Sequence, residues 1–415
     1  MQNEIEIPPF FLCPISLEIM RDPVAISTGI TYDRANIEKW IFSSNNTTCP
    51  VTKQHLRDFE LTPNHTLRRL IQSWCSLNAS SGVERIPTPK PPADKAHITR
   101  LIDQASTKSP HTLIKCLAEL RAIASESAAN RRSLEAAGAV EFLSTIIVEM
   151  SSNSEKDRSS SFEEEIEQRK SIDEALSALH HLQLSESALK KIADMSFLEC
   201  LTKILQRSNY ESCTFALDLM QSVLESADPM RLASLSLDFF TEIVQILQDQ
   251  ISSKATKTAL KLLIHLCPWG RNRVKASEAG AVSALIDLLL DCSDKRISEM
   301  TLVLLDQLCG CAEGRAELLS HGAGLAVVSK KIFRVSNLAS ERAVRILFSV
   351  SRFSGTATVA QEMAQLGVVA KLWLVLQVDC EVNTKEQALE ILKLHAKAWK
   401  NSPCIPPDLL VSYPS

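Results

Sequence analysis

Aromatic residues are scarce in this sequence, and long apolar runs are missing. Phenylalanine, tryptophan and tyrosine together make up 5% of the 415 residues, so few rings are present to stack on nucleic-acid bases. The formal net charge is −4, which gives no general attraction to nucleic acid or to acidic membranes. The apolar stretch 366–378 is too short to span a bilayer and contains Lys371. We therefore expect no nucleic-acid partner and no transmembrane segment.

A secretion signal is also missing. Residues 1–6 lack the basic and then apolar pattern of a signal peptide. The twelve cysteines are scattered, mostly in apolar helical contexts, which is typical of reduced thiols and not of a disulfide framework. These features predict a cytoplasmic protein, with residence in the nucleus or at the periphery of a membrane left open.

Motifs of a self-contained active site are absent as well. The sequence has no Gly-rich phosphate-binding loop, no His-Glu-x-x-His and no Gly-x-Ser-x-Gly. The nine histidines are scattered among apolar helical segments. We therefore assign no catalytic residue and expect no cofactor.

Changes of composition divide the chain into four parts. Residues 8–78 mix strand-like, turn-like and helical pieces, whereas 79–95 carry four prolines among small and charged residues and predict a linker. In residues 96–400 apolar side chains recur at spacings of 3, 4 and 7, which predicts helices. Residues 401–415 form a tail.

The helical part repeats itself with a period of about 42 residues. Residues 272–282 resemble residues 130–140, and the glycine of this stretch recurs at Gly322 and Gly367. A degenerate copy lies at 192–198. Several helices per unit, with a glycine at the turn into the last one, predict an α-solenoid, because glycine gives the backbone freedom that a tight corner needs.

One unit of the solenoid is longer than the others. Its surplus falls on residues 151–169, which are rich in serine and acidic residues and poor in apolar ones. Such a composition buries too little apolar surface to order the chain. We therefore predict a disordered insertion there.

The N-terminal part carries the most informative motifs. A first Cys-Pro loop begins at Cys13, a hairpin is predicted between residues 22 and 34, and an amphipathic segment over 35–42 predicts a short helix. A second Cys-Pro loop begins at Cys49, and a closing helix is predicted over 68–77. This order of elements is that of a RING finger.

The metal ligands of a RING finger are missing. Two zinc sites need eight Cys or His ligands, but residues 1–75 contain only three cysteines and two histidines, with no Cys-x-x-Cys pair. We therefore expect no metal, and we expect polar contacts to hold the loops. This structural role is assigned to Cys13, Glu18, Asp22, Asp33 and Arg34. The run around Cys13 offers no activating base, so this residue is predicted to be a buried packing thiol and not a nucleophile.

At this point a family resemblance is evident. Residues 8–78 closely resemble a U-box, the zinc-free relative of the RING finger, and residues 96–400 resemble armadillo repeats, although HEAT repeats have a similar length. A U-box, a Pro-rich linker and such repeats resemble the plant U-box/armadillo ubiquitin ligases. The expected fold is a small α+β U-box domain followed by an all-α armadillo-type solenoid.

The resemblance implies that a ubiquitin-conjugating enzyme binds in a shallow apolar groove. Carried over by position, the groove residues are Ile15, Leu17, Trp40, Pro50, Val51 and Lys53. A solvent-facing tryptophan with apolar neighbours suits a small, weak interface. The alternatives are that Ile15, Leu17 and Trp40 belong to the core, that the Pro-Val pair only shapes a turn, and that the lysine is an ordinary surface residue.

The resemblance also implies a ubiquitin transferase that acts as a scaffold and forms no covalent intermediate. It would orient the charged conjugating enzyme and ubiquitin for attack by substrate lysines, while the groove of the armadillo repeats, lined by the helix after each glycine, recruits the substrate. A role in plant stress or defence signalling is implied as well. The rival hypothesis is a non-catalytic armadillo adaptor with an inactive U-box.

Overall fold

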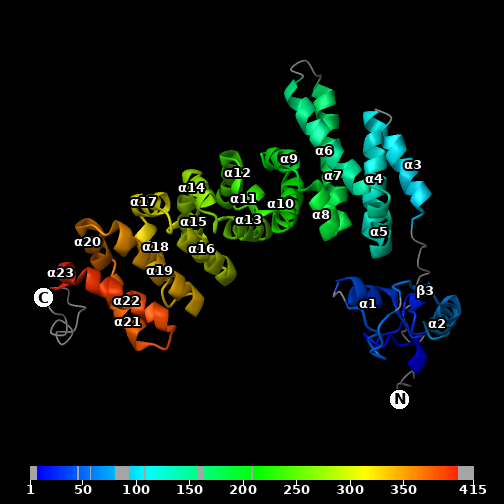
Figure 1. The fold of residues 1–415 in the computed structure, drawn as a ribbon, viewed down its shortest axis with the longest axis horizontal. Helices are drawn as coiled ribbons and strands as arrows, with labels where there is room; N and C mark the ends of the chain where they lie inside the picture. Colours follow the sequence, from blue (N-terminus) through cyan, green and yellow to red (C-terminus); the bar gives the residue numbers. More distant parts are fainter. Residues whose placement is uncertain are drawn as a thin grey trace. The chain divides into compact units, whose positions relative to one another are not determined.

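The computed structural model divides the chain into two compact units, residues 1–92 and 93–415 (Figure 1). Across the two units, the described residues are 7–43, 46–56, 58–79, 93–106, 109–156, 162–206 and 209–400. The division falls inside the predicted linker, of which residues 80–92 lie outside the described residues. The predicted tail, 401–415, also lies outside them.

The first unit contains a three-stranded antiparallel sheet in the order β2-β1-β3. Strand β1 (Pro23–Ala25) pairs with β2 (Thr31–Asp33) and with β3 (Thr62–Pro63). Gly29, in the turn between β1 and β2, has a φ of 80°, a conformation that glycine adopts without strain. The hairpin predicted between residues 22 and 34 is therefore present.

Helices cover the rest of the first unit. A short 3₁₀ turn, η1 (Pro9–Phe11), opens it, and α1 (Arg34–Glu38) continues into a π-helical turn, η2 (Lys39–Ser43). The closing helix, α2 (His65–Leu77), begins three residues earlier than predicted. It does so because the side chain of Asn64 accepts a hydrogen bond from the amide of Leu67 and caps the helix there. Eleven residues form a buried core between these elements, among them the large side chains of Met20, Tyr32, Ile37 and Ile71.

The second unit is helical, and its described part contains six three-helix repeats, preceded by α3 (Lys95–Ala105) and α4 (Pro110–Glu126) and followed by α23 (Ala396–Trp399). The first helices are α5 (Ala128–Ala136), α8 (Glu186–Ile192), α11 (Pro229–Ala233), α14 (Gly270–Glu278), α17 (Ala312–Ser320) and α20 (Ala357–Gln365). The second helices are α6 (Ala139–Lys156), α9 (Met195–Leu205), α12 (Leu237–Asp249), α15 (Ala281–Asp291), α18 (Gly324–Lys331) and α21 (Val368–Gln377). The third helices are α7 (Phe162–Leu182), α10 (Tyr210–Glu225), α13 (Ser253–Leu266), α16 (Lys295–Leu308), α19 (Asn337–Ser354) and α22 (Val382–Leu394).

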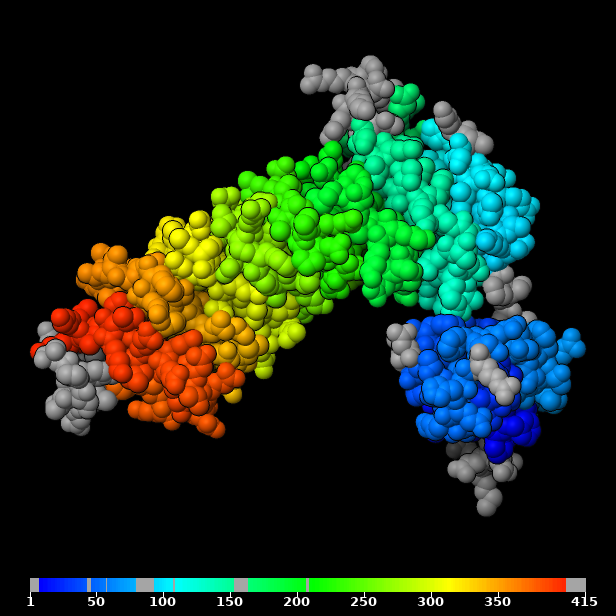
Figure 2. Space-filling model, viewed as in Figure 1, coloured from blue at the N-terminus to red at the C-terminus, as the bar shows by residue number. Residues whose placement is uncertain are grey.

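Each repeat packs on the next through helices of the same kind. The third helices contact one another in succession from α7 to α22, and α4 contacts α7. In Figure 1 α10, α13, α16 and α19 follow one another along the solenoid, and the surface colours in Figure 2 pass through it in sequence order. One continuous apolar core runs from Ile98 to Trp399. Neighbour-to-neighbour packing of this kind is that of a solenoid.

Asn130 and Asn272, which occupy equivalent positions in the two similar stretches 130–140 and 272–282, each close one helix against the next. The amide of Asn130 donates to the Ile123 carbonyl at the end of α4, at 3.2 Å. In the same way Asn272 donates to the Leu266 carbonyl at the end of α13, at 3.1 Å. Both asparagines are buried. They satisfy carbonyls that the last turn of a helix leaves without partners. This role accounts for the recurrence of the asparagine.

The predicted glycine corners are confirmed at three places and differ at a fourth. Gly138, Gly280 and Gly367 have φ values of 82°, 81° and 68° and lie before second helices. Gly322 does not share this conformation. In that repeat α18 begins at Gly324, where an added Cβ would lie 2.1 Å from the Leu318 carbonyl oxygen. Close helix approach, and not a left-handed turn, therefore requires the glycine there.

The insertion predicted over 151–169 is wrong for most of its length. Helix α6 extends to Lys156 and α7 begins at Phe162, so only residues 157–161 lie outside the described part. The acidic residues that suggested disorder lie in the first turn of α7, where negative charge is favourable. Glu165 also pairs with Arg169 one turn later, at 3.8 Å.

Among the described residues, a helix both long and apolar enough to cross a membrane is not found. Only α20 and α21 taken together satisfy that test, and they are bent by 73° relative to each other.

Candidate functional site

Two loops of the first unit share one backbone conformation. They are loop 1, residues 13–18, and loop 2, residues 49–54, which are 36 positions apart. In each loop the amide of the fifth residue, Leu17 or Lys53, donates to the carbonyl of the first residue, at 2.8 and 3.0 Å. The amide of the first residue donates to the carbonyl of the last, at 2.8 Å in both. Leu17 and Lys53 both have a φ of 59°. The two Cys-Pro motifs are therefore repeats in structure as well as in sequence.

The thiol of Cys13 lies at the centre of loop 1 and is fully buried, as predicted. Its sulfur accepts hydrogen bonds from the amide of Asp33, at 3.3 Å, and from the side chain of Asn36, at 3.6 Å. Burial raises the pKa of this thiol, but the backbone amides of Asp33, Ser16 and Ile15 and the Asn36 side chain together outweigh it, so the pKa is lowered. Cys13 thus joins loop 1 to the second strand of the hairpin, β2, and to the helix that follows it, α1.

Cys49 has the equivalent role in loop 2, which the sequence analysis did not assign. Its buried sulfur lies 3.1 Å from the Tyr32 hydroxyl and accepts from the Thr28 hydroxyl at 3.5 Å and the Thr52 amide at 3.4 Å. Burial raises the pKa of this thiol, but the bonds from Thr28, Thr52 and Tyr32 outweigh it and lower the pKa to about 6. Burial and the neighbouring Cys49 raise the pKa of Tyr32.

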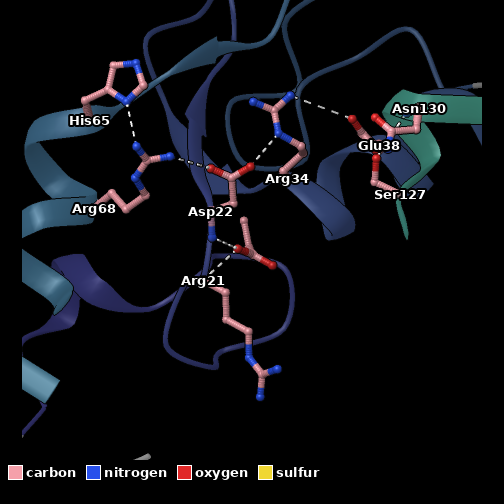
Figure 3. A network of polar contacts seen from close by, with 9 residues as sticks. Arg21, Asp22, Arg34, Glu38, His65, Arg68, Ser127 and Asn130 are labelled. Carbon is pink, nitrogen blue, oxygen red and sulfur yellow. Dashed lines mark hydrogen bonds and ion pairs between the residues drawn. The ribbon is translucent and has the colours of Figure 1, made fainter. Parts of the chain in front are cut away.

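A charged network fixes the start of the sheet to both helices (Figure 3). Asp22 Oδ2 pairs with Arg34 Nε at 2.6 Å, and Asp22 Oδ1 lies 3.7 Å from Arg68 Nη1. Figure 3 shows the two arginines approaching Asp22 from opposite sides. One carboxylate oxygen of Asp33 accepts from the amides of Arg21 and Asp22, both at 2.8 Å. The structural roles predicted for Asp22, Asp33 and Arg34 therefore have specific contacts.

Glu18 differs from the prediction. This residue is exposed, and it contributes its backbone carbonyl, which closes loop 1 by accepting from the Cys13 amide. The sequence analysis also missed Arg68, Asn36 and the Tyr32–Cys49 contact. The repeated Cys-Pro motif was the available signal for Cys49, whereas Arg68 comes from a distant helix and had none. No group of three or more His, Cys, Asp or Glu side chains suited to a metal ion occurs within the described residues.

One face of α1 and η2 joins the two loops. Asn36 and Trp40 are four residues apart, so they point to the same side of a helix. Asn36 donates to the Ser16 hydroxyl in loop 1 at 3.0 Å, and the Trp40 indole donates to the carbonyl of Thr48, next to loop 2, at 2.8 Å. These bonds place Trp40 between the loops.

The outer surface of this arrangement is apolar. Leu17 and Ile15 are 73% and 36% exposed, which excludes the alternative that these two belong to the core, and Val51 is 51% exposed. Trp40 and Pro50 are half-buried. The ammonium group of Lys53 lies 5.8 Å from the centre of the Trp40 ring, within the range of a cation–π contact. Of the six predicted groove residues, Ile15 and Leu17 lie in loop 1, Pro50, Val51 and Lys53 lie in loop 2, and Trp40 lies on η2.

In the second unit, polar contacts join neighbouring repeats, and one cluster of them lies on the third helices. Asp218 on α10 lies 3.2 Å from His180 Nε2 on α7 and 2.8 Å from Lys254 Nζ on α13. Burial raises the pKa of Asp218, but the bonds from these two side chains outweigh it and lower the pKa. A cleft of about 340 Å³ lies beside His180 and is lined by residues of α7 and α10. Second helices carry such contacts as well, since Glu141 on α6 pairs with Lys191 on α8 at 2.7 Å.

Comparison with known proteins identifies both units. The model of the U-box domain matches residues 7–80, and the model of the plant U-box protein ARM repeat region matches residues 97–415. A U-box joined to armadillo repeats defines a class of ubiquitin ligases, and the chain belongs to the plant U-box family within it.

Full-length relatives support this membership. The chain is 56% identical to E3 ubiquitin-protein ligase PUB23 and 55% identical to E3 ubiquitin-protein ligase PUB22, both from Arabidopsis thaliana. The alignments cover 100% of this chain and 98% and 100% of the relatives. A solved structure of the interaction between cadherin and beta-catenin has a TM-score of 0.60 at 14% identity over 81% of this chain and 61% of that one, which supports the solenoid fold. The protein is a ubiquitin ligase, and its partners are a conjugating enzyme, ubiquitin and substrates of the armadillo repeats.

Proposed function

We propose that Ile15, Leu17, Trp40, Pro50, Val51 and Lys53 form the surface that binds the ubiquitin-charged conjugating enzyme. The observation that carries this proposal is the exposure of Leu17 and Val51 at the tips of two loops that are rigid at their bases. Large apolar side chains that remain exposed on a fixed backbone mark an interaction surface, and a central half-buried tryptophan suits its energetic centre. Intact groove positions also argue against the inactive-adaptor hypothesis.

Catalysis in this proposal is orientation of the thioester. The surface holds the conjugating enzyme so that ubiquitin folds back onto it, and the substrate amine attacks the thioester carbon while the thiol of the conjugating enzyme leaves. The ligase supplies no nucleophile, because both loop thiols are buried and act as hydrogen-bond acceptors. Lys53, whose ammonium group lies over the Trp40 ring, is proposed to donate to the conjugating enzyme and ubiquitin together.

Substrates are proposed to bind along the third helices of the solenoid. These helices carry the charged side chains that face neighbouring repeats, including Asp218 and Lys254, and the cleft beside His180. A surface built from several repeats can recognise an extended protein segment through side chains of different repeats.

Single-turnover discharge of ubiquitin from a charged conjugating enzyme to free lysine tests the groove. We expect Trp40→Ala to slow discharge by about ten-fold or more, since a hot-spot residue contributes on the order of 2 kcal/mol to binding. Leu77→Ala is the matched control, because Leu77 is 81% exposed on α2. Equal rates for both variants, with folded protein in each case, exclude the proposed surface. We expect Lys53→Arg to retain activity and Lys53→Ala to lose it in the same assay.

Metal dependence is tested with the same reaction. We expect a zinc chelator to leave discharge unchanged, because the contacts of Cys13, Cys49 and Asp22 hold the loops. Loss of activity on chelation, restored by zinc, contradicts this expectation.

We also propose that the protein acts in the cytoplasm and in stress or defence signalling. The support is the pattern of scattered, mostly buried cysteines and the family resemblance. Fractionation of plant cells that express a tagged full-length chain tests the location. The stress phenotype of a null mutant tests the role in signalling. Exclusive recovery in another compartment, or no phenotype of a null mutant under stress, contradicts them.

A further inference from the structure

An arginine-rich surface surrounds an exposed phenylalanine near the C-terminal end of the solenoid. Phe353, at the end of α19, is 63% exposed. The guanidinium carbons of Arg315 and Arg352 lie 5.0 and 5.7 Å from the centre of its ring, and Arg352 lies 5.7 Å from the Phe348 ring as well. Guanidinium groups at this distance from a ring form cation–π contacts.

Two further arginines extend the surface along α19. Arg342 and Arg345 lie 3.0 and 3.3 Å from the same carboxylate oxygen of Asp306 on α16. Asp306 is largely buried, and burial raises its pKa in spite of the two arginines. One carboxylate balances at most one of the two guanidinium charges. A positive charge is therefore left on this part of the surface.

The other two arginines are weakly compensated. Arg352 pairs with Glu390 at 3.3 Å, but both side chains are about half exposed, and an exposed pair of this kind is screened by water. The hydrogen bonds of Arg315 go to neutral acceptors, the Cys309 carbonyl at 3.0 Å and the Ser354 hydroxyl at 3.2 Å. Four guanidinium groups thus meet two carboxylates among these contacts. The arginine surface, defined by Arg315, Arg342, Arg345, Arg352, Phe348 and Phe353, is a basic patch with an apolar centre.

We propose that the arginine surface binds an acidic, extended protein segment that carries one large apolar side chain. The apolar side chain packs on Phe353, and the flanking carboxylates pair with the arginines. Bidentate pairing with carboxylates is the geometry that guanidinium groups favour. The proposal rests on substrate recruitment by the solenoid and adds the chemistry of the recruited segment.

The spacing of the charges supports a segment of several residues. Arg342 and Arg352 are ten helical positions apart, which corresponds to about 15 Å along the axis at about 1.5 Å per residue. An extended chain covers that distance with about five residues at about 3.3 Å each. Nucleic acid is the less suitable occupant, because the chain as a whole is acidic, with a net charge of −4.

Fluorescence anisotropy with full-length protein tests the proposal. The probe is a labelled nine-residue peptide of aspartate and glutamate with one central leucine, and the comparison probes are the same peptide with lysine at every acidic position and a single-stranded RNA of nine nucleotides. We expect the acidic peptide alone to bind, and we expect Arg352→Gln and Phe353→Ser each to weaken binding by about five-fold or more. Conservative changes, Arg352→Lys and Phe353→Leu, should restore most of the affinity. Arg271→Gln, at an exposed arginine of the first helix α14, is the matched control and should bind as the unaltered chain does.

The outcomes separate this proposal from the one on the conjugating enzyme. Equal affinity of Arg352→Gln, Phe353→Ser and Arg271→Gln overturns the arginine surface, as does preferential binding of the basic peptide or the RNA. Thermal melting by circular dichroism verifies that each variant is folded. Ubiquitin discharge to free lysine should be unchanged in all of these variants, whereas Trp40→Ala should lose discharge and keep the affinity for the acidic peptide. Failure of one proposal is therefore visible without failure of the other.

Discussion

At the scale of single residues, the sulfur atoms of Cys13 and Cys49 lie at the centres of the two loops. Each accepts hydrogen bonds from groups outside its own loop: Asp33 and Asn36 for Cys13, and Tyr32 and Thr28 for Cys49. In a RING finger a zinc ion at such a centre joins loop to sheet. Here a thiol with several donors makes the same connection.

The lowered pKa of Cys49 predicts a pH dependence of stability. The folded-state pKa is about 6, below the usual value of 9.0, so the ionised thiol stabilises the folded U-box. This contribution is fully present above pH 9, declines as pH falls, and is lost below about pH 6. We expect the free energy of unfolding to rise between these values by on the order of 1 kcal/mol per pH unit.

Hydrogen exchange in peptides that cover loop 2 measures this effect, after correction for the intrinsic pH dependence of exchange. Cys49→Ser is the control variant, because a serine hydroxyl keeps the size and hydrogen bonding but does not ionise in this range. The same pH slope in both proteins would show that the thiol does not ionise when folded.

The contacts of Asp22 predict a large effect of its removal. In Asp22→Ala Arg68 loses its carboxylate and Arg34 keeps only Glu38, at 3.8 Å, while both arginines remain about three-quarters buried or more. We expect a loss of about 2–3 kcal/mol in the stability of the U-box, since an unpaired, partly buried charge is costly. Glu18→Ala, at an exposed residue, should change stability by less than about 0.5 kcal/mol. Urea denaturation followed by hydrogen exchange in β1 distinguishes the two, and equal effects would contradict the role of the network.

At the scale of elements, local sequence patterns predict the helices and the hairpin. Contacts between residues distant in the sequence determine how the loops are held and whether the acidic stretch is ordered. The repeat of Cys-Pro predicted two loops, and glycine spacing predicted the corners at Gly138, Gly280 and Gly367. The contact of Arg68 with Asp22 joins residues 46 positions apart in the sequence, and no local pattern reports such a distance. The composition of the acidic stretch after residue 162 predicts disorder. Composition alone does not report that α7 packs on α4 and α6, and this packing orders the helix.

The two kinds of glycine in the repeats predict different mutational costs. An added Cβ at Gly280 meets no atom within 4 Å, so Gly280→Ala is penalised by the left-handed backbone alone, at about 1 kcal/mol. At Gly324 the Cβ would overlap the Leu318 carbonyl oxygen at 2.1 Å, so α17 and α18 must separate. We expect Gly324→Ala to cost about 3 kcal/mol, comparable to severe overpacking.

Thermal unfolding of the full-length variants, monitored by circular dichroism, ranks these two substitutions. Gly280→Asn provides the control, because asparagine tolerates the left-handed conformation better than alanine does. A larger loss for Gly280→Ala than for Gly324→Ala would show that backbone conformation outweighs helix approach.

At the scale of the whole molecule, the chain consists of two units with separate cores. Each core is continuous within its unit, which predicts that each folds alone. We expect a fragment of residues 1–92 to stimulate ubiquitin discharge to free lysine at a rate within about two-fold of the full chain, since orientation of the thioester needs only the U-box. The fragment 93–415 should keep the affinity for the acidic peptide and stimulate no discharge.

Size-exclusion chromatography and circular dichroism establish that each fragment is folded before these assays. Discharge that requires residues 93–415 would show that the solenoid contributes to the chemistry as well as to recruitment. Removal of the solenoid should also abolish transfer to a bound substrate while leaving transfer to free lysine, because only the former depends on proximity.

The equivalence of the two loops has a consequence for the selectivity of the proposed surface among conjugating enzymes. Residues 13–18 and 49–54 share their hydrogen-bond pattern and the φ of the fifth residue, so the two loops of the proposed surface offer equivalent positions that differ in side chain. Leu17 and Lys53 occupy the same left-handed position in their loops, where Leu17 is apolar and Lys53 is cationic. An exchange of these two residues would preserve both loop conformations and reverse the order of the apolar and the cationic side chain on the proposed surface. Selectivity among conjugating enzymes would then depend on the orientation in which the partner binds.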